Sequence, residues 1–120
     1  YGKVIKEVEQ WNENNKTYIN TDPYLDHILD IDLALSQINA MDIIITTSNT
    51  TAHLAGSIGK ETWVMVPKVP EWRWGIKGSR SQWYNSVKIF RQEKQFNWEQ
   101  VVETVYKELN IFIKNKKLDK

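Results

Sequence analysis

Four polar residues, Ser48-Asn49-Thr50-Thr51, stand between an apolar run and a stretch of small residues. Ser48 or Asn49 can cap a helix by accepting a hydrogen bond from a first-turn N–H group. The N–H groups left free at such a helix end, together with the helix dipole, favour a phosphate or a carboxylate. Residues 48–51 therefore indicate either a plain helix cap or an anion site.

A histidine follows this turn at a distance of about one helical turn. On a helix that begins near Thr50, His53 shares a stripe with Thr50 and Ser57, and this stripe is expected to face the mouth of the turn. The stripe expected to pack on a sheet holds Thr51, Leu54, Ala55 and Ile58. Small residues that would let helix and strand backbones approach closely are Ala52, Ala55, Gly56 and Gly59. His53 is either a ligand-binding residue or an ordinary packed one.

The segment before the turn is a candidate strand. Residues 43–47, IIITT, are apolar or β-branched without alternation, which is typical of a strand buried on both faces of a parallel sheet. A buried strand that runs into a helix is half of a Rossmann-like βαβ unit, and its turn lies at the ligand-binding carboxyl edge of the sheet. Because the strand, the hydroxyl-rich turn, the small-residue helix and the histidine occur together, a ligand site and a purely structural role are equally well supported.

Periodicity elsewhere predicts the rest of an α/β fold. Helices are expected at residues 3–13, at residues 31–41 and from residue 98 to about residue 112, and strands at residues 17–19, 62–66 and 87–90. This alternation predicts a single Rossmann-like domain over residues 1–120, an open parallel sheet with helices on both faces. The Lys-rich end through Lys117 is expected to be a solvated helix terminus.

Four aspartates lie between residues 21 and 32. A metal site is one interpretation, but the spacing lacks the regular alternation and the closing Glu of a calcium loop. We instead expect a solvated loop in which Asp30 or Asp32 caps the next helix, and in which His27 is a partly buried loop residue. No metal is expected. The four are Asp22, Asp26, Asp30 and Asp32.

Residues 67–83 form the longest stretch without periodicity and are rich in aromatic and cationic side chains. Aromatic faces stack on sugar and base rings, and Lys or Arg neutralises phosphate. We expect Lys68, Trp72 and Arg73 to form a secondary ligand loop, because they are nearer the end of the preceding strand. Trp74 and Trp83 are expected to hold the loop down.

Composition excludes several classes of function. The net charge of +1 argues against nucleic-acid binding as the main activity. The chain has no Cys, no apolar run of membrane-spanning length and no signal-peptide pattern, so a cytoplasmic protein without a membrane span is expected. A phosphoacceptor receiver domain is excluded because no Asp stands at the end of a buried strand.

Two stretches carry a resemblance to a known family. They are SNTTAHLAGSIGKETWVMVPKVPEWRWG, residues 48–75, and SQWYNSVKIFRQ, residues 81–92. With the helix that follows, they resemble the C-terminal half of heptosyltransferase-like glycosyltransferases, in the branch often fused behind tetratricopeptide repeats in bacterial proteins. Many relatives have Asp where this chain has Ser48. The resemblance implies a GT-B-type fold and a donor site for the diphosphate of a nucleotide sugar, lined by Ser48, Asn49, Thr50, Thr51 and His53.

The function expected from this resemblance is donor binding within a glycosyltransferase that transfers a sugar to an unknown acceptor. No cofactor is expected beyond the nucleotide-sugar substrate, and no catalytic residue is assigned. The alternative is a non-catalytic nucleotide-binding or scaffold module that retains the fold. Saturable binding of nucleoside diphosphates would separate the two hypotheses.

The N-terminus suggests a piece of a longer protein, because the first residue is Tyr1 and relatives have a strand before the Tyr1-Gly2 turn. We expect upstream residues or another chain to supply this strand. The 120-residue piece alone is then expected to be poorly stable or to self-associate. It is also expected to transfer no sugar unaided, because the acceptor half of the enzyme is absent.

Overall fold

The computed structural model describes residues 2–24, 26 and 28–119. Its contacts divide the chain into two compact units, Tyr1–Ala34 and Leu35–Lys120. The predicted loop position of His27 lies outside the described residues.

The first unit contains α1 (Gly2–Asn14), which confirms the helix predicted near the N-terminus. The strand predicted at residues 17–19 is wrong, because these residues form no strand. The side chain of Asn12 forms hydrogen bonds with both backbone polar groups of Ile19. Its Oδ1 accepts from the Ile19 N–H at 2.7 Å, and its Nδ2 donates to the Ile19 carbonyl at 2.9 Å. A strand needs a neighbouring strand for these groups, and here a side chain satisfies them instead.

The aspartate-rich segment uses its carboxylates to hold backbone turns. Asp22 accepts from the N–H of Tyr24 at 2.9 Å. Asp26 accepts from the N–H groups of Ile28 and Leu29, at 2.9 and 3.0 Å. Asp30 accepts from the N–H of Leu33 at 2.9 Å, which confirms it as the cap of α2 (Ile31–Ala40). Within the described residues, no three acidic, histidine or cysteine side chains are grouped as a metal ion would require.

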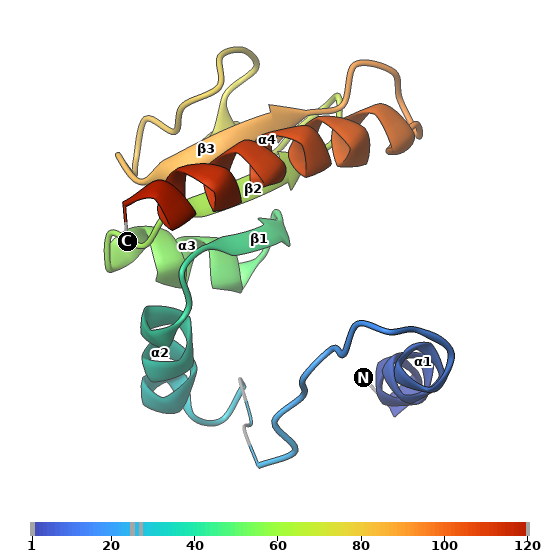
Figure 1. Ribbon diagram of the computed structural model, residues 1–120. Helices are drawn as coiled ribbons and strands as arrows, with labels where there is room; N and C mark the ends of the chain where they lie inside the picture. The colour runs from blue at the N-terminus through green and yellow to red at the C-terminus, as the bar shows by residue number, and fades with distance from the viewer. Residues whose placement is uncertain (1, 25, 27, 120) are drawn as a thin grey trace. The chain divides into compact units, whose positions relative to one another are not determined.

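The second unit is built on a three-stranded parallel sheet in the order β1 (Ile44–Thr47), β2 (Thr62–Val66) and β3 (Val87–Arg91). The crossover from β1 to β2 is α3 (Thr50–Ser57), and β3 is followed by α4 (Glu99–Leu118). Figure 1 shows α4 running along β2 and β3. The predicted α/β class with an open parallel sheet is confirmed.

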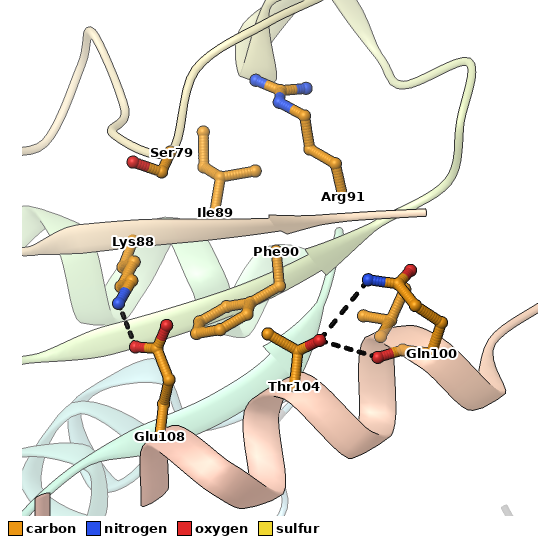
Figure 2. Close-up of a pocket in the computed structure, with 9 residues that line it drawn as sticks. Ser79, Lys88, Ile89, Phe90, Arg91, Gln100, Thr104 and Glu108 are labelled. Carbon is orange, nitrogen blue, oxygen red and sulfur yellow. Dashed lines mark hydrogen bonds and ion pairs between the residues drawn. The ribbon is translucent and has the colours of Figure 1, made fainter. Parts of the chain in front are cut away.

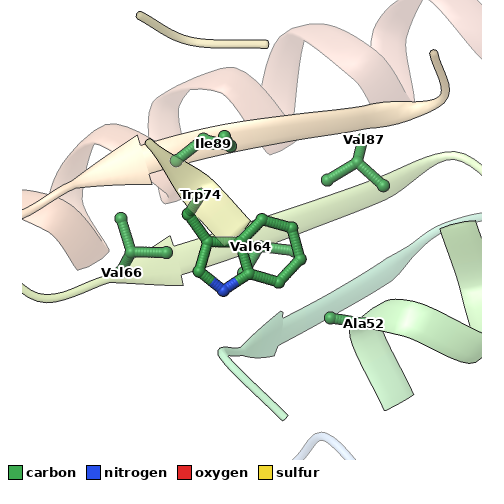
Figure 3. Close-up of a cluster of buried hydrophobic side chains, with 6 residues drawn as sticks. All are labelled: Ala52, Val64, Val66, Trp74, Val87 and Ile89. Atoms are coloured by element: carbon green, nitrogen blue, oxygen red, sulfur yellow. The ribbon is translucent and has the colours of Figure 1, made fainter. Parts of the chain in front are cut away.

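Side chains of β2 and β3 alternate between two apolar clusters, one on each face of the sheet. On the α3 face the cluster comprises Ala52, Val64, Val66, Trp74, Val87 and Ile89 (Figure 3). On the α4 face the buried residues are Trp63, Phe90, Val101 and Val105. The connection from β2 to β3 contains no α-helix, and the indole of Trp74, 2 % exposed, covers that part of the sheet instead.

The prediction that residues 43–47 are buried on both faces is wrong. Ile45 is 36 % exposed and Thr47 is exposed, whereas Ile44 and Thr46 are half-buried. The reason is position, because β1 is the edge strand of the described sheet and pairs only with β2. The strands covered on both faces are β2 and β3.

The predicted packing stripe of α3 is also partly wrong. Ala52, Ala55 and Gly56 are buried, whereas Ile58 is 41 % exposed. The helix therefore turns its smallest residues inward, which permits close packing on the sheet. Thr51 and Leu54 are only half-buried.

Gly56, in α3, and Gly59, just after it, do not serve the close approach of helix and strand backbones that we predicted. A Cβ on Gly56 would lie 2.6 Å from the ring of Tyr84, so this position makes room for an aromatic side chain. Gly59 has φ +71° and no atom within 4 Å of a Cβ. The N–H of Gly59 bonds to the carbonyl of Gly56 at 3.1 Å and that of Lys60 to Ala55 at 3.0 Å, which is a Schellman cap.

Candidate functional site

A polar pocket opens at the carboxyl end of β1, where the turn enters α3. Its volume is roughly 370 Å³, and its walls come from the turn, from α3 and from the loop after β2. The lining residues are Ser48, Asn49, Thr50, His53, Glu71 and Arg73. The fold thus brings together four of the five residues predicted for the donor site and adds Arg73 from the predicted ligand loop.

Asn49 is the N-cap of α3, as one of our two alternatives predicted. Its backbone is extended, with φ −154° and ψ −179°, and its Oδ1 accepts from the N–H of Ala52 at 3.2 Å. Its Nδ2 also donates to the hydroxyl of Thr46 at 2.9 Å. The N–H groups of Thr50 and Thr51 belong to the first turn and have no acceptor within the helix. They are therefore available to an anion.

Ser48 links the turn to the loop after β2. The indole N–H of the buried Trp74 donates to the Ser48 hydroxyl at 2.8 Å. The hydroxyl keeps its own proton, which can be donated into the pocket. Ser48 is thus not the helix cap, and its place in the pocket is fixed by Trp74.

His53 is held between two aromatic side chains. Its ring stacks on Trp74 with a centroid distance of 5.0 Å and an interplanar angle of 21°. Its Nδ1 lies 3.0 Å from the hydroxyl oxygen of Tyr84. Sequence reasoning missed Tyr84, and the only signal was the small residue at position 56, which receives the Tyr84 ring.

Arg73 brings a cation to the pocket, and Glu71 brings a carboxylate that we had not predicted. Their side chains form an ion pair at 3.1 Å and remain 44 % and 56 % exposed, so the pair adds little to stability. The guanidinium also lies over the Trp72 ring, 4.9 Å from its centroid. Together the two charged groups offer donors for phosphate oxygens and an acceptor for hydroxyl groups.

Arg91, at the end of β3, ties the loop to the sheet and is a second residue that sequence reasoning missed. Its guanidinium donates to four carbonyls, those of Trp74 at 2.5 Å, Gly75 at 2.8 Å, Gly78 at 2.7 Å and Lys77 at 3.2 Å. Partial burial lowers the pKa of Arg91 from its ordinary value. No spacing in the sequence indicates this contact, because it joins segments that only the fold brings together.

The other predicted ligand residues lie outside the pocket. The Lys68 ammonium donates to the carbonyl of Glu93 at 2.8 Å. Trp72 is 70 % exposed and meets Trp83 edge to face at 5.6 Å. Trp74 is buried as predicted, whereas Trp83 stays 58 % exposed and does not hold the loop against the core. Thr51 does not line the pocket.

A second pocket, of roughly 210 Å³, lies between β3 and α4. Figure 2 shows Lys88 and Phe90 pointing from β3 towards α4, and an ion pair between Lys88 and Glu108. The Thr104 hydroxyl bonds back to the carbonyl of Gln100 at 2.8 Å. The first of these contacts joins α4 to the sheet and the second lies within α4, so we regard this pocket as part of the framework.

No family model, curated protein or solved structure matches the chain. None of the helices that the structure describes has the length and apolar character needed to cross a bilayer.

Proposed function

We propose that this chain is the donor-binding domain of a GT-B-type glycosyltransferase related to the heptosyltransferases. In this proposal the pocket at residues 48–53 holds the diphosphate of a nucleotide sugar. The supporting observation is the pocket itself, in which a capped helix N-terminus, the Thr50 hydroxyl, His53 and Arg73 meet at the carboxyl end of a parallel strand.

The chemistry that such a site would perform is stabilisation of a leaving group. When an acceptor hydroxyl attacks the anomeric carbon, the bond to the diphosphate breaks and negative charge grows on the phosphate oxygens. Donors that are already in place stabilise this charge without reorganising. The N–H groups of Thr50 and Thr51 and the guanidinium of Arg73 are donors of this kind. In this proposal, residues outside this chain bind the acceptor.

A second candidate is a scaffold that retains the fold without binding nucleotides. It is favoured by the internal partners of the turn, since Asn49 bonds to Thr46 and Ala52, and Ser48 bonds to Trp74. Arg73 is also paired with Glu71. Side chains that already have partners within the protein need no ligand to hold their positions.

Calorimetric titration of the whole chain with uridine, adenosine and guanosine diphosphates tests the proposal. The matching nucleosides, which lack phosphate, are the ligand controls. We expect saturable binding of at least one diphosphate, and roughly tenfold weaker binding in Thr50→Val and in Arg73→Gln. Thr50→Val removes a hydrogen bond to the charged phosphate, and Arg73→Gln removes the positive charge of the guanidinium. Thr47→Val and Arg80→Gln are matched controls outside the pocket and should bind like the parent. Absence of saturable binding by all three diphosphates would favour the scaffold.

A further inference from the structure

The imidazole of His53 is held in one orientation by its neighbours. Trp74 covers one face of the ring, and its own indole is fixed by burial and by the hydrogen bond to Ser48. Tyr84 meets the ring edge at a centroid distance of 5.8 Å and places its hydroxyl 3.0 Å from Nδ1. A flip of the ring would put a carbon atom opposite this hydroxyl and lose the hydrogen bond.

Tyr84 is itself anchored before any ligand arrives. Its ring lies against Gly56, where even a methyl group would lie 2.6 Å from it. Its N–H donates to the Ser81 hydroxyl at 3.2 Å, and its carbonyl accepts from the N–H of Val87 at 3.1 Å, at the start of β3. The hydroxyl therefore has a fixed position relative to α3.

We propose that the Tyr84 hydroxyl donates to Nδ1 of His53 and so keeps the neutral imidazole in the tautomer that carries its proton on Nε2. The Nε2–H group is then a hydrogen-bond donor for an anion in the pocket. This inference rests on the proposed function. It makes Tyr84 a positioning residue, because it acts through His53 and does not line the pocket.

The choice of tautomer follows from hydrogen-bond chemistry. A neutral imidazole has one N–H donor and one lone-pair acceptor, whereas a tyrosine hydroxyl can act as either at neutral pH. If Nδ1 donated to Tyr84, the second nitrogen would present a lone pair to the phosphate oxygens, and the two would repel. With Tyr84 as the donor, Nε2 presents a proton. No hydrogen bond to Nε2 is present within the described part of the chain, so this donor remains for a ligand.

The test is nitrogen-15 NMR of the histidine rings in the whole chain, at a pH where the imidazole is neutral. We expect His53 of the parent to show the single tautomer protonated on Nε2. Tyr84→Phe keeps the ring against Gly56 and removes only the hydroxyl, so it should show a mixture of both tautomers. Tyr106→Phe, at an exposed position of α4, should behave like the parent.

Binding is measured on the same variants with inorganic pyrophosphate and with the three nucleoside diphosphates. We expect Tyr84→Phe to bind roughly fivefold to tenfold more weakly and Tyr106→Phe to bind normally. A parent tautomer protonated on Nδ1, or unchanged tautomer populations in Tyr84→Phe, would overturn the inference. Unchanged affinity in Tyr84→Phe would overturn it too, while leaving the proposed function intact. The expected tautomers without any diphosphate binding would refute the proposed function and, with it, the role of Nε2–H as an anion donor.

Discussion

Replacing Arg91 by Met should loosen the loop that carries Trp74. Met keeps the apolar stem of the side chain and removes every donor. Of the four hydrogen bonds, those to the carbonyls of Trp74 and Gly75 are partly buried, and those to Lys77 and Gly78 are exposed. Water can replace the exposed pair, so we count only the partly buried pair, at about 1–1.5 kcal/mol each. The expected loss is about 2–3 kcal/mol in the free energy of unfolding.

Two readouts follow the effect of Arg91→Met. Urea unfolding monitored by circular dichroism gives the stability, and the indole N–H signal of Trp74 reports whether its hydrogen bond to Ser48 persists. We expect this signal to move towards the position of a solvent-exposed indole. Arg80→Met is the matched control, because Arg80 is an exposed arginine of the same loop.

The result that would refute the reasoning is specific. If Arg91→Met costs less than about 0.5 kcal/mol, as an ordinary surface substitution does, the four bonds do not support the loop. An unchanged Trp74 signal would show that the indole is held by its own packing, and Arg91 would then have no part in positioning the site.

Four other substitutions test separate parts of the structure. Gly56→Ala should cost about 1–3 kcal/mol and displace Tyr84, because the added methyl overlaps its ring; an unchanged ring signal of Tyr84 in NMR would contradict this. Gly59→Ala should cost about 1 kcal/mol by thermal unfolding, since φ is +71° there, with no effect on diphosphate affinity. Asn49→Ala should cost about 1 kcal/mol as a lost cap and should weaken diphosphate binding by more than that; equal stability loss with unchanged affinity would leave Asn49 as a cap alone. Trp72→Ala should leave stability within about 0.5 kcal/mol because the side chain is exposed, and an effect on nucleotide-sugar binding would extend the site to this residue.

Local signals in the sequence were sufficient for the elements that depend on local chemistry. The apolar run at residues 62–66, which ends before Pro67, predicts a strand, and the structure confirms it with the same bounds. At each of two helix caps the sequence left two candidate residues, and the structure shows Asn49 and Asp30, whose side chains bond to N–H groups three residues ahead of them.

The predictions that failed depended on neighbours that periodicity does not reveal. Residues 43–47 have the pattern of a central strand, yet β1 is at the edge of the described sheet. Ile19 has good strand propensity, but Asn12 satisfies its backbone. In α3 the small residues, rather than the large ones, face the sheet, because helix and sheet pack closely there.

The residues of the candidate site also divide into those that local sequence signals reveal and those that only the fold brings together. The turn and His53 could be found from residue types alone, because cap and helix spacing place them together. Tyr84, Glu71 and Arg91 could not, since each reaches the site through the loop after β2 or from β3. That loop has no periodicity, and its path is fixed by the carbonyl bonds to Arg91.

The central claim, that the turn after β1 binds a diphosphate, is tested most directly by following backbone amide signals during titration with a nucleoside diphosphate. We predict that the amides of Thr50 and Thr51 shift most and in a saturable manner, together with the side-chain signals of His53 and Arg73. The amides around Lys88 and Glu108, in the pocket between β3 and α4, should stay unchanged. Saturable shifts confined to that second pocket, or no saturable shift anywhere, would contradict the claim.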